Sequence, residues 1–351
     1  MFKDIKYLTA FSIPITAVIG LYFGGILTFL TPLFAFGFIP VVEIILREDS
    51  SNYSADEKES RVKSSFFDWL LYLNVPIVFG ILLYALSIVA TGDYTGLEFV
   101  GMILSTGIVL GSNGINVAHE LGHRHGKVQR FLAKMLLLPS HYMHFYIEHN
   151  FGHHLNAATH EDPATAKYNQ TIYAFWFNSI IEQYKSAWSI QRNLLKREGK
   201  SFFALENDMF WYLCAQIFYL VFVSIFFGWI GFAFVVLSGV VGFLLLETIN
   251  YIEHYGLLRH KRESGRYERV KEVHSWNSNH VLGRMMLYEL TRHSDHHYRS
   301  SKKYQVLEYH DISPQMPYGY PTSMVIALIP PLWFKIMNPR IPNEMKPKAA
   351  A

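Results

Sequence analysis

Residues 97–123 read LEFVGMILSTGIVLGSNGINVAHELGH, an apolar run long enough to cross a bilayer that leads directly into the pattern H-E-x-x-H. The two histidines of HELGH, His119 and His123, stand one helical turn apart and therefore on one face of a helix. In metalloproteases this pattern holds zinc, and the intervening glutamate, here Glu120, is the general base. The stretch predicts a metal site at the end of a membrane helix, and the other histidines decide how large that site is.

The composition indicates a membrane protein whose metals are bound by histidine and carboxylate. Of the 351 residues, 51% are hydrophobic, 16% are aromatic and only 17% are charged, which is too apolar for an ordinary soluble protein. Cys214 is the single cysteine, which excludes a disulfide framework and a cysteine-ligated metal site. The 17 histidines are more than incidental core or surface use requires, so their grouping is informative.

Apolar runs predict six transmembrane helices in an all-α fold. The first run is expected to be a retained helix, because no small-residue cleavage site follows it. We expect one integral-membrane domain over residues 1–351. The expected spans are residues 8–23, 29–46, 69–90, 97–117, 210–227 and 232–249.

The distribution of basic residues predicts the orientation of these spans. The connections GGILT, TGDYTG and GWIG contain no lysine or arginine, and all 31 basic residues lie in the regions on the other side of the spans. By the positive-inside rule, that other side is cytoplasmic. The sequence therefore predicts a cytoplasmic, histidine-rich cap built from residues 118–208 and 251–340.

The candidate metal ligands form four groups, each close to the end of an apolar run or in the segments that form the cap. They stand in the stretches HELGH, EHNFGHH, NYIEHYGL and LTRHSDHH. The candidate ligands are His119, His123, His149, His153, His154, His254, His293, His296 and His297.

The spacing within these groups suits two metal ions side by side. In a helix, histidines at i and i+4 can bind one ion, whereas a histidine at i+5 points about 100° away and is free to reach a second. A single zinc needs three or four ligands, so this many imidazoles suit two ions of higher coordination number. Imidazole binds iron, zinc and copper, so the ligand type alone does not select the metal.

Acidic residues beside these histidines are candidate catalytic groups: Glu120, Glu148, Glu253 and Asp295. We expect them to accept the outward ring N–H of a ligand histidine or to offset the charge of the metals. The remaining histidines lack ligand spacing and are expected at the surface or around the site. They are His125, His141, His144, His160, His260, His274, His280 and His310.

At these residues the chain resembles the membrane alkane monooxygenases, within the wider fatty acid desaturase and hydroxylase superfamily. The boxes of that family stand here as HELGHR, EHNFGHH, NYIEHYGL and LTRHSDHH, and further similarity lies in EDPATA and in PYGYPTSMVIALIPPLWFKIMNPR. The departures are Arg124, His160, Thr291 and Tyr298, and none of them removes a candidate ligand.

The resemblance implies a non-haem di-iron enzyme that uses O2 to convert an alkane to a primary alcohol. It implies two iron ions on the nine histidines, in an integral protein of the bacterial inner membrane with its active site on the cytoplasmic side. Two electrons must then come from a separate rubredoxin served by a reductase, because four cysteines would be needed to hold a rubredoxin iron and this chain has one. The lipid bilayer is a further expected partner, and nucleic acid is not.

Two other segments have competing interpretations. The basic segment at residues 259–271, RHKRESGRYERVK, could dock an acidic electron carrier or bind lipid headgroups. The small residues of GSNGIN, at residues 111–116, could border a substrate channel, although close helix packing is the interpretation we favour.

Three alternative functions remain open at this point. A zinc protease would use His119, His123 and Glu120 but would leave seven clustered histidines without a role. A fatty acid desaturase or a xylene-type hydroxylase of the same superfamily would make an alkene or a benzylic alcohol. A metal carrier or transporter would consume no O2, and transporters usually place ionisable residues within their spans, where this sequence has almost none.

Overall fold

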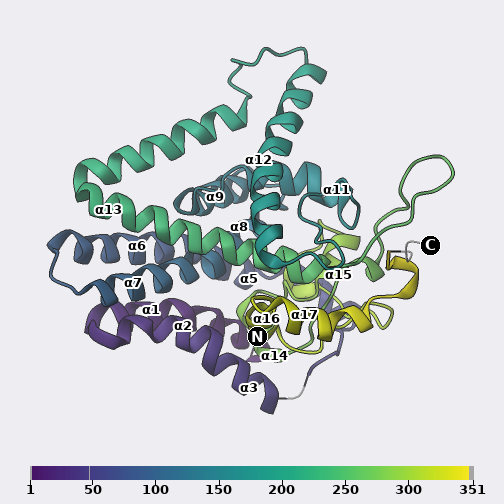
Figure 1. The fold of residues 1–351 in the computed structure, drawn as a ribbon, viewed down its shortest axis with the longest axis horizontal. Helices are drawn as coiled ribbons and strands as arrows, with labels where there is room; N and C mark the ends of the chain where they lie inside the picture. Colours follow the sequence, from purple (N-terminus) through teal and green to yellow (C-terminus); the bar gives the residue numbers. More distant parts are fainter. Residues whose placement is uncertain (1, 47, 348–351) are drawn as a thin grey trace.

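The computed structural model of the chain describes residues 2–46 and 48–347, and within them the fold is helical (Figure 1). The only β pairing among these residues consists of two isolated bridges, Lys261–Tyr267 and Asn277–Gln315. The predicted all-α class is therefore confirmed for the described part of the chain.

Helices that are long and apolar enough to cross a membrane cover every expected run. The described residues contain five of them: Asp4–Phe23, Gly25–Ile45, Phe66–Thr91, Gly96–Gly122 and Asp208–His254. Since the two expected runs at 210–227 and 232–249 fall in one continuous element, the number of crossings depends on the path of that element.

That element, α13 (Asp208–His254), has two arms that meet at Gly228. Gly228 has φ 67° and ψ −174°, a left-handed conformation that glycine adopts without the steric cost a side chain would add. Figure 1 shows the first arm running outward and the second returning from a sharp bend. The two expected runs lie in separate arms.

The other long apolar stretches are assembled from shorter helical segments. The first two comprise η1 (Phe2–Phe11), α1 (Ser12–Phe23), η2 (Gly25–Phe29), α2 (Leu30–Leu33), the π-helical η3 (Phe34–Phe38) and α3 (Ile39–Ile45). The next two comprise α5 (Phe66–Tyr72), α6 (Asn74–Thr91), α7 (Gly96–Val109), the π-helical η4 (Leu110–Ile115) and α8 (Asn116–Gly122).

Close packing of α7 and η4 against the second arm of α13 requires small residues. A Cβ atom added at Gly107 would lie 2.4 Å from the Cβ of Val241, and one at Gly111 would lie 3.1 Å from Cδ1 of Leu245. A larger side chain at either position would push the helices apart. This supports the packing interpretation of the segment 111–116, and the contact brings HELGH beside the end of α13. Gly111, Ser112, Ile115 and Asn116 also line an apolar cavity, so the segment borders that space as well.

Shorter helices surround one end of this bundle. Figure 1 places the bend of α13 and the α6–α7 connection at one end, and α11, α15 and α17 at the other. These outer segments include α4 (Ala55–Lys63), α9 (Lys127–Leu137), η5 (Leu138–Ser140), α10 (Phe145–Glu148), η6 (His149–His153), α11 (His154–Asn156) and α12 (Ile172–Arg197). After α13 come η7 (Glu272–His274), α14 (Val281–Met286), α15 (His293–Tyr298), η8 (Tyr304–Val306), α16 (Tyr320–Ala327), α17 (Pro330–Met337), η9 (Asn338–Arg340) and η10 (Asn343–Met345).

Candidate metal centre

Two histidine groups lie at the end of the bundle that carries α11 and α15. Their members come from four different parts of the chain. Each residue in a group offers one ligand atom, and within a group these atoms all lie within 4.8 Å of one another. The first group contains His119, His123, His149, His154 and His296. The second contains His153, His254, His293 and His297.

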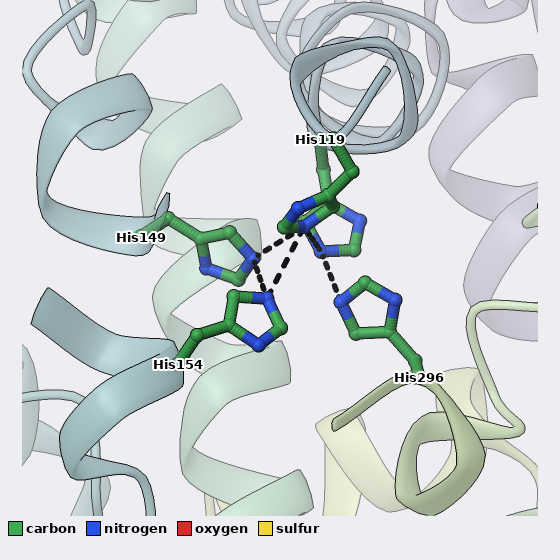
Figure 2. A group of neighbouring side chains, drawn as sticks. His119, His149, His154 and His296 are labelled. Atoms are coloured by element: carbon green, nitrogen blue, oxygen red, sulfur yellow. Dashed lines mark hydrogen bonds between the residues drawn. The ribbon is translucent and has the colours of Figure 1, made fainter. Parts of the chain in front are cut away.

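In the first group the Nε2 atoms converge on a common point. Figure 2 shows His119, His149, His154 and His296 with their rings turned toward one another; they come from α8, from the continuous helical segment η6–α11 and from α15. Nε2 of His119 lies 3.0 Å from that of His296, and Nε2 of His149 lies 3.0 Å from that of His154. Nε2 of His123 is 3.1 Å from that of His149.

The second group shows the same convergence and is more deeply buried. Nε2 of His293 lies 3.2 Å from Nε2 of His254 and 2.9 Å from Nε2 of His297. Nε2 of His153 lies 3.2 Å from Nε2 of His297. The two groups are neighbours, because the ring centroids of His154 and His297 are 4.7 Å apart.

These distances fit rings arranged around metal ions. Imidazole nitrogens bound at about 2.0–2.1 Å, at angles between roughly 90° and 109°, would lie about 2.8–3.4 Å from one another. The closest separations within the groups, 2.9–3.4 Å, fall in that range. Neutral imidazoles cannot satisfy five converging nitrogens by hydrogen bonds alone, since each has one N–H donor.

The electrostatics of the rings also suit metal binding, which needs neutral imidazole. Burial lowers the pKa of His149, His154 and His296 well below the ordinary value, and neighbouring rings lower it further. Burial likewise lowers the pKa of His123 to about 3. These rings are therefore uncharged at neutral pH and can offer their Nε2 lone pairs to a cation.

We had expected histidines at i and i+4 to share one metal ion. This prediction is confirmed in two of the histidine stretches and is wrong in the third. His119 and His123 share the first group, and His293 and His297 share the second, as i, i+4 spacing predicts. In EHNFGHH, however, His149 groups with His154, at i+5, and His153 belongs to the other group. The cause is the π-helical turn η6, in which the repeat lengthens toward i+5 and changes which side chains share a face.

Glu120 faces away from the metal centre. Its Oε1 lies 2.6 Å from Nη2 of Arg124 and accepts a hydrogen bond from the backbone N–H of Tyr304. The general base of a zinc protease has to face a zinc-bound water, so this geometry argues against the zinc protease hypothesis. The departure Arg124 thus pairs with the glutamate of its own box.

The other three predicted carboxylates have different partners. Asp295 accepts from Lys302, from the backbone N–H of Glu308 and from His310. Within the described part of the chain, Asp295 thus makes no hydrogen bond to the Nδ1 atom of a histidine in either group.

Glu148 accepts from Ser186 Oγ at 3.3 Å, and its other oxygen is buried without a hydrogen-bond partner. Glu253 accepts from the Tyr320 hydroxyl, and its Oε2 lies 3.1 Å from Nε2 of His293. Glu253 therefore approaches the side of the ring that faces the metal centre, where we had expected an acceptor behind the ring.

A carboxylate that the sequence reasoning missed fills the expected role. Oδ2 of Asp162 accepts from Nδ1 of His153 at 2.9 Å, and it also accepts from the hydroxyl of Thr165. Burial lowers the pKa of His153, but the charge of Asp162 outweighs it and leaves that pKa above the ordinary value. The segment EDPATA, which contains Asp162, was already a point of resemblance, and its position shortly after the second box was the available signal.

The remaining histidines stay outside both groups, as expected. His310 contacts Asp295, His141 lies 3.2 Å from the carbonyl oxygen of Val235, and His280 contacts Ser278. His144 is buried without a partner for Nε2, and His274 accepts from the backbone N–H of Lys271. His125, His160 and His260 are exposed.

An apolar cavity reaches the metal centre. Apolar side chains from several elements line it, among them Phe36 of η3, Leu245 and Ile249 of α13, and Met286 of α14. His119 and His149 of the first group and His293 of the second line it as well. A hydrocarbon in this cavity would therefore lie against both histidine groups.

The comparisons with known proteins agree with this geometry. The family model described as fatty acid desaturase matches residues 96–326, which is more than half of the chain. The chain therefore belongs to the fatty acid desaturase family.

Within that family, the chain belongs with the alkane 1-monooxygenases, which confirms the resemblance found in the sequence. It is 38% identical to alkane 1-monooxygenase 2 of Alcanivorax borkumensis over 88% of this chain and 81% of the relative. It is 37% identical to the alkane 1-monooxygenase of Acinetobacter baylyi over 88% of this chain and 75% of the relative. A more distant relative, at 29% identity over 91% of this chain and 84% of the relative, is the xylene/toluene monooxygenase hydroxylase component XylM of Pseudomonas putida.

Proposed function

We propose that this protein is an alkane 1-monooxygenase that hydroxylates the terminal carbon of an alkane. The reaction consumes the alkane, O2, two electrons and two protons, and it yields a primary alcohol and water. The observation that carries the proposal is the apolar cavity whose wall includes His119, His149 and His293. A cavity with few polar groups favours a substrate without them, because burying an unpaired polar group costs free energy.

We propose two iron ions as the resident metals, one on each histidine group. When bound, these ions supply the reduction of O2 and the oxidation of the C–H bond. The chain contributes five imidazoles to one ion and four to the other, and Asp162 fixes the ring orientation of His153. The apolar wall orients the hydrocarbon with one end toward the histidines and keeps water away from the reacting carbon.

The proposed roles of the four predicted carboxylates follow from their contacts. Glu253 stands beside the metal side of His293 and can offset the charge of the ions. Glu148 interacts electrostatically with His153 of the second group and holds a buried, unpartnered oxygen that can do the same. Glu120 and Asp295 position the boxes in which they stand through their pairing with Arg124 and Lys302.

We propose six membrane crossings, with each arm of α13 crossing once, in a single domain over residues 1–351. The first arm, before Gly228, and the second, after it, are then antiparallel spans. We propose that the metal centre lies on the cytoplasmic side of the inner membrane, and the positive-inside rule supports this, because the basic residues lie at the ends of the spans that carry the histidines.

The proposed electron donor is a separate rubredoxin, reduced by a rubredoxin reductase. The basic segment 259–271 begins next to the metal centre, because the backbone N–H of Arg259 donates to the carbonyl oxygen of Ala158 at 2.7 Å. The Arg259 guanidinium donates to the carbonyl oxygen of Leu155, the residue after His154. An acidic carrier docked on this segment would lie a short distance from the ring of His154.

A second candidate function is the hydroxylation of a methyl group on an aromatic ring, which the likeness to XylM favours. The same two-metal chemistry would act on either methyl group, and the shape of the cavity decides between them. Desaturation of a fatty acid is the third possibility within the family, and its product is an alkene.

The test is product analysis with the purified protein in lipid nanodiscs. The protein is supplied with iron, rubredoxin, reductase and NADH, and it is given dodecane, p-xylene or a fatty acid in separate reactions. We expect 1-dodecanol, formed with O2 consumption, and two irons per chain by elemental analysis. The matched control is His296→Ala, which lacks one ring of the first group. An alkene, a benzylic alcohol alone or one iron at full occupancy would refute the proposal.

A further inference from the structure

A second apolar pocket lies directly against the reaction cavity. The side chains of Phe36, Leu245 and Met324 line both the cavity and this pocket, so they form the partition between the two. They come from η3, α13 and α16, which are three separate elements. A shift of these three side chains would join the two spaces.

The second pocket opens on the outer surface of the bundle. Its outer lining includes Val325 and Leu328, which are 39% and 41% exposed. Phe36 and Leu245 belong to helices long and apolar enough to cross a membrane. With the membrane crossings proposed above, the pocket opens beside these two helices toward the hydrocarbon of the bilayer.

The lining of this pocket offers no free polar group to a ligand. Its two polar side chains are Trp176 and Thr248, and the indole N–H of Trp176 donates to the hydroxyl of Thr248 at 3.2 Å. The Thr248 hydroxyl in turn donates to the carbonyl oxygen of Leu244. Because these groups satisfy one another, the pocket suits a saturated hydrocarbon better than a ligand with a polar head.

We propose that this pocket is the access site for the hydrocarbon substrate, which passes from the bilayer between Phe36, Leu245 and Met324 into the reaction cavity. The inference rests on the proposed function, because it takes the substrate to be an alkane. The partition side chains have rotatable bonds, and the thioether side chain of Met324 adapts readily to different neighbours. Lateral access of this kind spares an insoluble alkane from crossing the aqueous phase.

A third apolar pocket provides a matched control. It lies between α1 and α6, is lined by residues such as Val18 and Ile77, and shares no lining residue with the reaction cavity. Val18 is 42% exposed, close to the 39% of Val325. A modification at Val18 therefore tests the effect of a bulky group on a similar surface that does not adjoin the cavity.

The experiment blocks each pocket reversibly through an introduced cysteine. Cys214 is the single cysteine and is exposed, so Cys214→Ser gives a background without thiols. Val325→Cys or Val18→Cys is then added and modified with benzyl methanethiosulfonate, and dodecane oxidation is measured before modification, after it and after thiol reduction. We expect modification at position 325 to lower kcat/KM about tenfold, with a smaller effect on kcat, and reduction to restore it. A loss at position 18 of the same size, or none at 325, would overturn the proposal.

A binding measurement separates this proposal from the proposed function. A brominated alkane should quench the fluorescence of Trp176, seen as the difference between the parent protein and Trp176→Phe, and modification at position 325 should abolish that quenching. If this quenching occurs but no alkane is oxidised, the access site stands and the proposed function fails. If alkane is oxidised without quenching, or if brominated phospholipid quenches Trp176 and alkane does not relieve it, the access site is refuted.

Discussion

The hydrogen bond between Asp162 and His153 gives the sharpest test of the two-metal proposal. Asp162 is fully buried at its side chain and accepts from Nδ1 of His153 at 2.9 Å, so it sets the tautomer that points Nε2 into the second group. Asp162→Asn removes the negative charge and keeps the size of the side chain. Loss of such a partner typically weakens metal binding about 10–100-fold, or ~1.4–2.7 kcal/mol.

The expected result is selective, because only one group contains His153. The four-histidine group should lose its iron first, while the five-histidine group, which has no contact with Asp162, keeps its own. Titration with a chelator, followed by elemental analysis, should show a variant that falls from two irons to one at about 10–100-fold lower chelator concentration than the wild type.

The control for this experiment is Glu161→Gln, which removes the same charge from the exposed neighbouring residue. It should release iron at the wild-type chelator concentration. The reasoning would be refuted if Asp162→Asn kept both irons as firmly as the wild type, or if it released the two irons together.

Three other expectations follow from named contacts. His296 and His297 are adjacent in the chain but belong to different histidine groups, so His296→Ala and His297→Ala should each change the Mössbauer signal of a different iron. Identical spectra for the two variants would contradict the assignment of these residues to separate groups. Glu120→Gln removes the charge of the nearer carboxylate beside Arg124 and leaves Asp68, at 3.7 Å, so it should lower the free energy of unfolding by roughly 1.5–3 kcal/mol while iron content stays at two. Loss of iron at unchanged thermal stability would count against this. A hydrogen bond from Lys271 lowers the pKa of Glu268 to about 2, so the contribution of Glu268 to stability is present above about pH 4.5 and is lost as the pH falls toward 2. Hydrogen exchange in the segment 259–271, corrected for the intrinsic rate, should become faster over that pH range. Glu268→Gln should abolish this pH dependence.

The contacts of the carboxylates show how far adjacency in sequence can mislead. Glu120 is next to His119 in the chain, yet on a helix neighbouring residues point in different directions, and Glu120 pairs with Arg124. Asp162 is nine residues from His153 and contacts it, because the loop after α11 folds back on the π-helical turn. Only the folded chain decides which acid meets which ring.

The sequence by itself determined the properties that depend on local patterns. The apolar runs predicted the long helices, the histidine boxes predicted the candidate ligands, and the boxes together indicated the family. These features are readable because bilayer thickness fixes the length of an apolar run, and because helical periodicity fixes which near neighbours share a face.

The tertiary structure decided how those parts meet. Which of His153 and His154 joins His149 rests on the π-helical turn η6, whose longer repeat brings His149 and His154 to the same face. The fold-back at Gly228 rests on one left-handed residue, and the adjacency of the two apolar pockets rests on side chains from η3, α13 and α16. Such arrangements depend on backbone deviations and on contacts between residues distant in sequence, and no local pattern encodes either.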